Sequence, residues 1–271
     1  MVKDITLGQY FPGNSFIHRL DPRAKLIITL FALIEIFVCK NFFSLALVFA
    51  FAIVSILISK ISFKVIFKGL KMIYLIIILT SILQIFYNKD GTVLVDCWKI
   101  QITTGGISTA VFMAVRIISL IFISSLLTYT TSPTALTDGL ERLLSPLKKL
   151  HIPVDTLAMM MTIALRFIPT LIEEIDKIMN AQKARGADLD SGNIIQRAKA
   201  LVPIFIPLFV NSFRRAYELA FAMECRCYNG SVNRTRMKKM KFSWRDGVAF
   251  LIIAAMLAGI ILLNHFFGAV I

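Results

Sequence analysis

The chain has 271 residues, of which 57% are hydrophobic and only 17% are charged. A soluble domain of this size has about a quarter of its residues charged, so this composition argues against a soluble enzyme or binding module. The mean hydropathy of +0.76 and the long apolar blocks instead indicate an all-α integral membrane protein. The net charge is +14, but no interleaved aromatic and basic motif points to nucleic acid.

Five apolar runs could cross a bilayer, and they cover residues 26–39, 42–58, 65–87, 105–130 and 248–267. A membrane span needs about 20 apolar residues. The first run is short, so we expect it to form a tight hairpin with the second, turning at Lys40-Asn41. About five transmembrane helices are therefore expected, four of them in an N-terminal membrane domain (1–131) and one at the C-terminus (246–271).

The distribution of Lys and Arg predicts which end faces the cytoplasm. If the N-terminus is inside, residues 1–25 and 60–71 carry eight cations, whereas the outer loops carry only Lys40, Lys89 and Lys99. Short cytoplasmic loops have this excess, so we expect a cytoplasmic N-terminus. The polar N-terminal stretch does not resemble a cleavable signal peptide. In the outer loop 88–104, turn residues between β-prone runs predict a small hairpin.

The region 132–245 is expected to form a cytoplasmic module of amphipathic and long helices. Ser132-Pro133 is a helix start, and the leucines that follow recur at helical spacing, as in a helix on a membrane surface or a partner. A long helix then runs to about Arg185, with Asp155 as its expected cap. A second runs from about Ile194 to Tyr228.

Each long helix ends in an Arg between small residues. The motifs are Ala184-Arg185-Gly186 and, 41 residues later in a weak internal repeat, Cys225-Arg226-Cys227. The plain interpretation is a cation at the negative end of a helix dipole, with Gly186 ending the helix. The functional interpretation is an Arg tip that enters a groove on a partner and pairs with carboxylates. Two matching motifs favour the functional interpretation and suit a two-lobed or dimeric partner.

A third motif precedes the first span and reads His18-Arg-Leu-Asp21-Pro22-Arg23-Ala-Lys-Leu26. It resembles the N-terminal signature of the transmembrane coupling subunit, or T component, of energy-coupling factor importers, and the two Arg motifs resemble the two coupling motifs of the same family. These are ABC-type importers of vitamins and trace metals in prokaryotic cell membranes. The resemblance covers essentially the whole chain. Cys-Arg-Cys departs from the more usual Ala and Gly, which leaves the role of Arg226 intact but bears on how the helix is capped.

The resemblance implies that two ABC ATPase subunits bind the Arg-bearing helix ends. It also implies that a small substrate-binding membrane subunit docks on the apolar helix faces, and that ATP-driven motion of the helices releases its cargo inward. The chain would then be a non-catalytic transducer in the lipid bilayer, with no cofactor of its own and with ATP bound by its partners. In agreement, the sequence has no G-x-x-x-x-G-K-[ST] loop to hold phosphates.

Two charges lie within predicted spans, where ionisable groups are costly and usually paired. Glu35 and Arg116 are expected at similar depth, so we hypothesise an intramembrane ion pair. The alternative is that Glu35 is solvated near the outer interface. The four cysteines suggest neither a disulfide framework nor a zinc site, so we expect no metal.

Two other functions remain open from the residues alone. An acidic cluster could hold Mg²⁺ and a diphosphate in a membrane prenyl or phosphoalcohol transferase; its members are Glu173, Glu174, Asp176, Asp188 and Asp190. No facing second acidic motif accompanies it. The other alternative is a conventional ABC permease that forms its own pathway.

Overall fold

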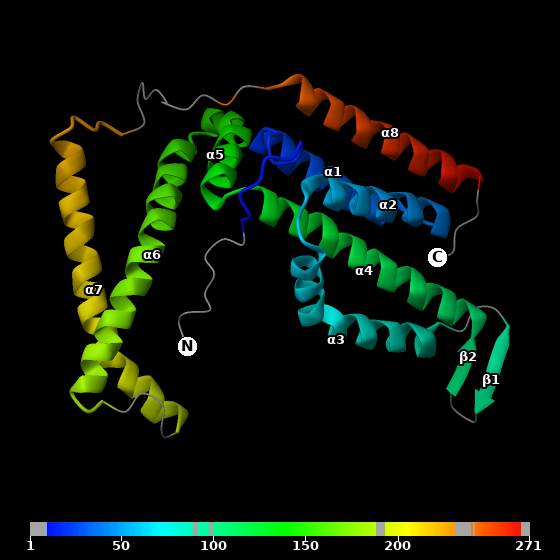
Figure 1. Ribbon diagram of the computed structural model, residues 1–271, viewed down its shortest axis with the longest axis horizontal. Helices are drawn as coiled ribbons and strands as arrows, with labels where there is room; N and C mark the ends of the chain where they lie inside the picture. The colour runs from blue at the N-terminus through cyan, green and yellow to red at the C-terminus, as the bar shows by residue number, and fades with distance from the viewer. Residues whose placement is uncertain are drawn as a thin grey trace. The chain divides into compact units, whose positions relative to one another are not determined.

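The computed structural model describes residues 10–88, 92–97, 100–187, 193–230, 240 and 242–266. Helices dominate this part of the chain, which confirms the predicted all-α class (Figure 1). In chain order the elements are α1 (Pro22–Val38), α2 (Phe42–Ser59), α3 (Phe63–Tyr87), β1 (Val93–Cys97), β2 (Ile100–Thr103), α4 (Thr104–Thr130), α5 (Pro133–Leu143), the 3₁₀ helix η1 (Ser145–Leu150), α6 (Val154–Ala184), α7 (Ile194–Glu224) and α8 (Trp244–Phe266).

Four of the described helices are long and apolar enough to cross a bilayer, namely α2, α4, α6 and α8. The helix α3 adds a fifth if its two parts, which are bent by 58°, count as one span. The predicted runs 42–58, 105–130 and 248–267 fall on α2, α4 and α8. The first run falls on α1, which has 17 residues and is therefore shorter than the roughly 20 that a span needs.

The turn between α1 and α2 lies at Lys40-Asn41, as predicted. The Asn41 side chain accepts a hydrogen bond from the Ser44 amide at 3.2 Å, and Ser44 Oγ accepts one from the Asn41 amide at 3.4 Å. This reciprocal capping box satisfies two amides that would otherwise be unpaired at the start of α2. Asn264, near the end of α8, donates to the Val38 carbonyl at 2.9 Å. The turn is thereby joined to the end of the last span.

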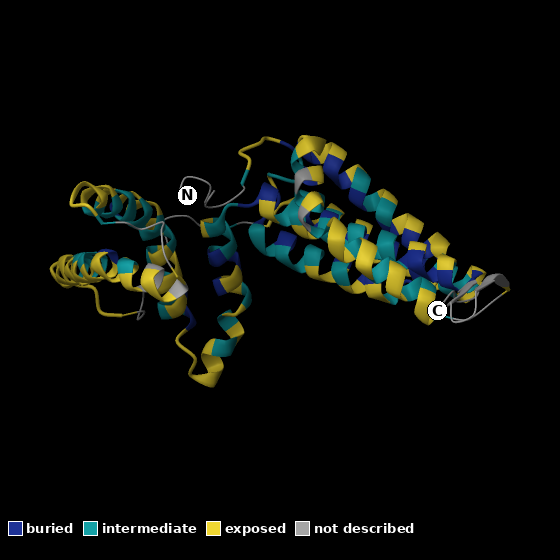
Figure 2. Cartoon of the chain, turned by 90° about the horizontal axis from the view of Figure 1, so that it is seen from below, coloured by how far each residue is buried: buried dark blue, intermediate teal, exposed yellow. Residues whose placement is uncertain are grey.

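Among the described residues, 10–142, 240 and 242–266 form one compact unit, and 143–187 with 193–230 form the other. In the first unit α4 packs against α1, α2 and α3, and α8 packs against α1 and α2. The core side chains, among them Ile36, Val48, Phe112 and Ile260, are buried on the facing sides of these helices. Their outer faces are exposed (Figure 2) and apolar, as lipid requires.

The helix α5 belongs to the first unit. A Cβ atom at Gly139 would lie 3.3 Å from the Pro22 carbonyl carbon, so α5 approaches the start of α1 closely. Ser132 Oγ accepts from the Ala135 amide at 3.3 Å, in keeping with the predicted start of this helix. The three-part division at 131/132 and 245/246 stays a prediction about how the chain is organised around a membrane.

The strands β1 and β2 pair antiparallel with Cys97 opposite Ile100, which confirms the hairpin predicted within residues 88–104.

The second unit consists of η1 and the two long helices α6 and α7, which cross (Figure 1). Gln182 of α6 donates to the Pro203 carbonyl of α7 at 3.4 Å, and Glu174 of α6 contacts Asn211 of α7. Earlier residues of α6 therefore face later residues of α7, and the two helices run antiparallel.

The predicted cap of α6 is wrong. The cap position is Pro153, and Asp155 lies in the first turn of the helix, where its carboxylate is 2.6 Å from the Lys148 ammonium. An acidic residue in the first turn is still favourable because of the helix dipole.

Gly106 is required where α4 starts against the end of α3. A Cβ atom there would lie 3.0 Å from the carbonyl oxygens of Ile85 and Asn88, so Gly106→Ala forces backbone apart. Overpacking of this kind costs about 1–3 kcal/mol, and we expect a lower thermal unfolding midpoint for the purified protein in nanodiscs. Gly259→Ala is the matched control, because its Cβ would meet only Leu47 at 3.6 Å. Equal midpoints for the two variants would contradict the close approach.

Candidate functional site

The first Arg motif forms a regular helix ending. Arg185 is the last residue before the chain leaves α6, and Gly186 adopts a left-handed conformation with φ +84°. The Ala187 amide donates to the Gln182 carbonyl at 3.0 Å, and the Gly186 amide donates to the Lys183 carbonyl at 3.0 Å. These are the two hydrogen bonds of a Schellman motif.

The second Arg motif has the same geometry. The Tyr228 amide donates to the Met223 carbonyl at 3.0 Å, and the Cys227 amide donates to the Glu224 carbonyl at 2.9 Å. Cys227 takes the left-handed conformation with φ +57° that Gly186 takes in the first motif. Arg226 therefore occupies the same structural position as Arg185, and the Cys-Arg-Cys departure leaves the capping pattern unchanged.

Both arginines are exposed, as are Ala184, Gly186, Cys225 and Cys227. Within the described part of the chain, no hydrogen bond or ion pair engages either guanidinium. A Cβ atom at Gly186 would meet nothing within 4 Å. Each motif is therefore an open, cationic helix tip with its forked donors available for carboxylates.

The antiparallel crossing separates the two tips. Because α6 and α7 run in opposite directions, their C-terminal ends point away from each other. Arg185 lies eleven residues beyond Glu174, and Arg226 lies eleven residues beyond Arg215, which pairs with Glu174. At 1.5 Å per residue, each tip is about 16 Å along its helix from that pair.

An exposed aromatic ridge follows α7 up to the second tip. Its members recur every four residues and are each exposed by 62% to 76%: Phe205, Phe209, Phe213, Tyr217 and Phe221. Side chains four apart form one continuous row on a helix surface, and the Phe209 and Phe213 rings are 4.6 Å apart. A contiguous apolar surface of this kind marks an interface with a membrane or an apolar partner.

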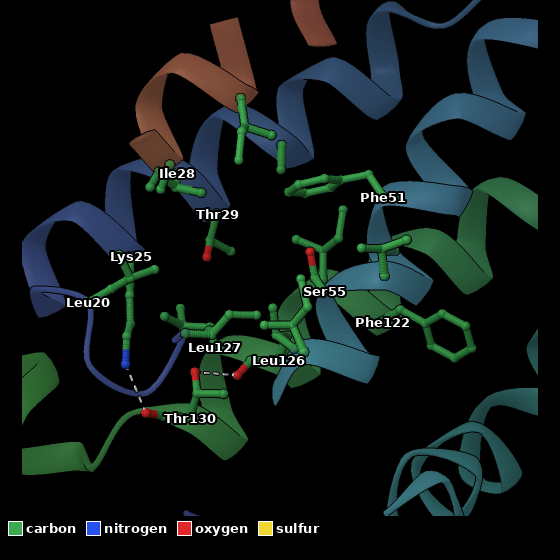
Figure 3. Close-up of a pocket in the computed structure, with 18 of the residues that line it drawn as sticks. Leu20, Lys25, Ile28, Thr29, Phe51, Ser55, Phe122, Leu126, Leu127 and Thr130 are labelled. Atoms are coloured by element: carbon green, nitrogen blue, oxygen red, sulfur yellow. Dashed lines mark hydrogen bonds between the residues drawn. The ribbon is translucent and has the colours of Figure 1, made fainter. Parts of the chain in front are cut away.

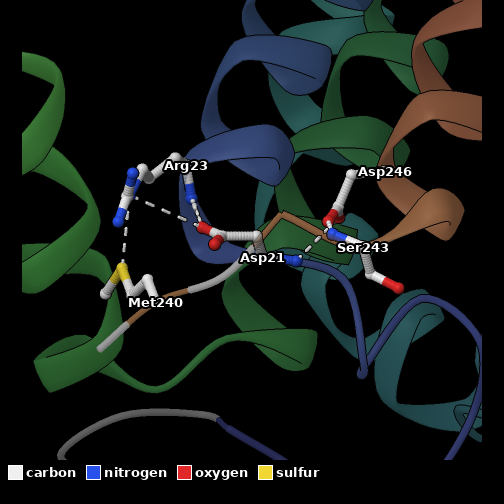
Figure 4. A network of polar contacts seen from close by, with 5 residues as sticks. All are labelled: Asp21, Arg23, Met240, Ser243 and Asp246. Atoms are coloured by element: carbon white, nitrogen blue, oxygen red, sulfur yellow. Dashed lines mark hydrogen bonds and ion pairs between the residues drawn. The ribbon is translucent and has the colours of Figure 1, made fainter. Parts of the chain in front are cut away.

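The N-terminal signature is a junction of helix ends (Figure 4). Asp21 caps α1 by accepting from the Arg23 amide at 2.9 Å, and its own amide donates to Asp246 of α8 at 2.9 Å. Asp246 also accepts from the Ser243 amide at 2.7 Å and is fully buried. One carboxylate therefore joins the starts of α1 and α8. Pro22 is the first residue of α1, where its missing N–H costs nothing.

Arg23 closes this junction from outside. Its guanidinium lies 3.8 Å from the Asp21 carboxylate, donates to Met240 Sδ at 3.4 Å and stands 5.8 Å from the centre of the Phe242 ring. The signature residues Asp21, Pro22 and Arg23 thus act within this chain, on the segment that leads into α8.

Lys25 ties the same junction to the end of α4. Its ammonium donates to the carbonyls of His18 and Thr130 at 3.1 and 3.0 Å and to Thr131 Oγ1 at 3.3 Å. It lies at one end of an apolar cavity of about 190 Å³ between α1, α2 and α4 (Figure 3). All three ammonium donors have acceptors, so Lys25 is a structural cation at this end of the cavity.

His18 orders the segment before α1. Its Nε2 lies 3.0 Å from the Phe11 carbonyl oxygen, which can only accept, so Nε2 carries the proton and Nδ1 accepts from Ser15 Oγ at 2.7 Å. Burial lowers the pKa of His18; the Phe11 hydrogen bond opposes this shift, and the nearby Lys25 charge adds to it. The folded chain favours the neutral ring, so stability falls as the pH drops through the ordinary histidine pKa of about 6.5.

The ion pair predicted between Glu35 and Arg116 is not formed in the structure. Arg116 donates instead to the Cys39 carbonyl at the end of α1, at 2.8 Å, and stands 4.7 Å from the centre of the Phe112 ring. The Glu35 carboxylate is buried and has no hydrogen-bond partner among the described residues. The free carbonyls at a helix C-terminus attract a cation in the same way that a carboxylate does.

Sequence reasoning missed three groups of residues. Asp246 belongs to a Ser243-x-x-Asp246 capping pattern, from which the start of a helix could have been predicted. The aromatic ridge could have been recognised from aromatic residues that recur every four positions within α7. The contact of Glu174 with Asn211 and Arg215 joins two helices and has no signal within either helix alone.

These features define a multi-pass helical membrane protein that presents two equivalent arginine tips and an exposed apolar ridge. Residues 13–238 match the family described as CbiQ, cobalt transport protein. Curated relatives named energy-coupling factor transporter transmembrane protein EcfT include those of Clostridium kluyveri (54% identical over 93% of each chain), Ruminiclostridium cellulolyticum (49% over 98% of this chain and 100% of the relative) and Bacillus subtilis (44% over 95% and 98%). The chain belongs to this family of energy-coupling factor transporter transmembrane proteins.

The junction at Asp246 can be tested by stability. Asp246→Asn places an amide N–H₂ against one of two backbone N–H donors, and leaving such a donor unpaired costs about 1–3 kcal/mol. We expect a lower thermal unfolding midpoint in nanodiscs. The control is Glu218→Gln, the same change at an exposed site. If Asp246→Asn melts with the parent protein, the carboxylate does not hold the junction.

Proposed function

We propose that this chain is the non-catalytic coupling subunit of a multi-subunit importer and transmits ATP-driven motion from two ABC ATPase subunits to a small substrate-binding membrane subunit. The observation that carries the proposal is the pair of equivalent arginine tips at opposite ends of two crossed helices. Two separate docking points of the same geometry match two copies of one partner or two similar partners.

The chemistry of the tips suits an acidic groove. A guanidinium beyond the last helical turn can form two parallel hydrogen bonds with a carboxylate. The exposed Schellman turn keeps bulky side chains away from Arg185, because Gly186 follows it. A rigid helix carries a displacement of either tip back toward the crossing.

The aromatic ridge of α7 supplies the second docking surface. It leads from Phe205 to Phe221 and ends five residues before Arg226. A partner that packs on this ridge is moved whenever the tip moves, so ATPase motion and substrate-subunit motion are linked through one helix. Its apolar character suits a partner that lies in the membrane.

The complex is proposed to lie in a prokaryotic plasma membrane and to serve the uptake of vitamins or other micronutrients. The excess of Lys and Arg in 1–25 and 60–71 supports a cytoplasmic N-terminus. The chain is proposed to need no cofactor or metal of its own, since ATP would bind to the ATPase subunits. The cargo would then be selected by the substrate-binding partner.

The two alternative functions are not favoured. Relatives at 44% to 54% identity carry the name of a transporter transmembrane protein, and none of those names refers to a transferase. Within the acidic cluster, Glu174 is engaged by Asn211 and Arg215. Asp188 and Asp190 lie outside the described residues.

Charge reversal at the tips tests ATPase docking. In the chain tagged and purified from its native membrane, Arg185→Glu/Arg226→Glu should lose the ATPase subunits, because like charges then face each other. Each single reversal should retain less ATPase than the parent. The control is Arg142→Glu, the same charge reversal at an exposed arginine of α5. Full retention by the double variant would contradict docking through the arginines.

Substitution in the ridge tests the second surface separately. Phe209→Ser/Phe213→Ser removes two adjacent rings and should release the small membrane subunit while the ATPases stay bound. Mass spectrometry of the purified complexes measures both. Leu251→Ser/Phe266→Ser, exposed apolar positions of α8, is the control for a general loss of apolar surface. Loss of the small subunit only in that control would move the docking surface to α8.

A further inference from the structure

The crossing of α6 and α7 is held by a polar cluster centred on Glu174. Glu174 Oε1 accepts from Asn211 Nδ2 at 2.6 Å, and its Oε2 lies 2.7 Å from an Arg215 Nη. Asn211 in turn accepts from Arg214 at 3.3 Å. The Glu174 side chain is only 11% exposed, so Oε1 is hydrogen-bonded and Oε2 is ion-paired where little water reaches them.

This cluster lies midway between the two functional tips. The distance along the sequence from Glu174 to Arg185 equals that from Arg215 to Arg226, at eleven residues each. Since both helices rise by about 1.5 Å per residue, the two arms from the cluster to the tips have equal length. A rotation about the cluster would therefore move both tips by similar amounts.

The packing around the cluster is uneven. On the side toward Arg226 the helices leave a gap of about 250 Å³, lined by Phe167 and Leu171 of α6 and by Leu219 and Met223 of α7. On the side toward Arg185, Gln182 contacts Pro203 directly. Because apolar packing is incomplete beside the cluster, the ion pair and its hydrogen bond fix where the helices meet while the gap leaves room for their angle to change.

We propose that Glu174, Asn211 and Arg215 form the pivot on which the two long helices turn. The three are positioning residues: they bind no partner and no nucleotide, and they set the distance and coupled motion of the arginine tips. The role of the pivot in moving the tips rests on the proposed coupling function. The fixed crossing itself depends only on residues of this chain.

The distance between the two helix arms is measured by double electron–electron resonance on the full-length chain in nanodiscs. The four cysteines are replaced by Ser, and spin labels are placed at the exposed positions Asn180→Cys and Ala222→Cys, one on each arm. The parent should give a single narrow distance peak. Glu174→Gln and Arg215→Gln should each lose that peak to a broad distribution, and the double variant should be no broader than either one.

Two variants serve as controls. Glu173→Gln makes the same change at the neighbouring exposed position and should keep the parent peak. Arg215→Lys keeps the charge and should retain most of it. If Glu174→Gln keeps the narrow peak, or if Glu173→Gln broadens it equally, the pivot is refuted.

ATPase binding is measured in parallel on the unlabelled chain with its native cysteines. Glu174→Gln should still co-purify with the ATPases, because both tips are intact. In the labelled complex, addition of MgATP should shift the peak of the parent, and this shift should be absent in Glu174→Gln. If the parent binds no ATPase while the distance results hold, the coupling function fails and the fixed crossing stands. If the ATPases bind and MgATP shifts both proteins equally, the function stands and the pivot is overturned.

Discussion

The antiparallel crossing of α6 and α7 determines what the rest of the second unit can do. Two helices joined in sequence by a short connection run in opposite directions, so their C-terminal ends point apart. A helix C-terminus attracts a cation and ends most easily in a left-handed residue. Repeating one ending on both helices therefore produces two equivalent cationic tips that point in opposite directions.

In the first unit, the N-terminal ends of helices α1 and α8 are stabilised by side chains of the same unit. Four amides at each helix start need acceptors, and burying those starts against one another makes the need severe. Asp21 and Asp246 supply acceptors at the starts of α1 and α8, and Lys25 donates to the Thr130 carbonyl at the end of α4. The signature sequence before α1 is thus explained by the geometry of helix ends inside the chain, without any partner.

The sequence allowed much of this to be predicted, for reasons that are local. Apolar run length identified α2, α4 and α8, turn residues identified the β1–β2 hairpin, and the Arg motifs identified both helix ends. Contacts between distant segments could not be predicted in this way. Depth along a helix suggested pairing of Glu35 with Arg116, but depth leaves the direction around the helix open, and Arg116 faces the Cys39 carbonyl. Glu174 was likewise grouped with its acidic neighbours in the sequence, because its partners Asn211 and Arg215 lie some 40 residues away.

The second unit has few means of holding itself together. In α6 the buried residues are Val154, Ala158 and Glu174, and in α7 the aromatic ridge is exposed. Most helix stability in proteins comes from packing of an apolar face, so these helices depend on their capped ends, on the ion pair at the crossing and on whatever covers the ridge. The helix ends are capped by the Asn193–Gln196 capping box at the start of α7 and by the Schellman turns at the C-terminal ends of α6 and α7. A surface that is stabilised when a partner covers it responds to that partner's movement, and the weak self-packing of this unit is consistent with a part that transmits motion between others.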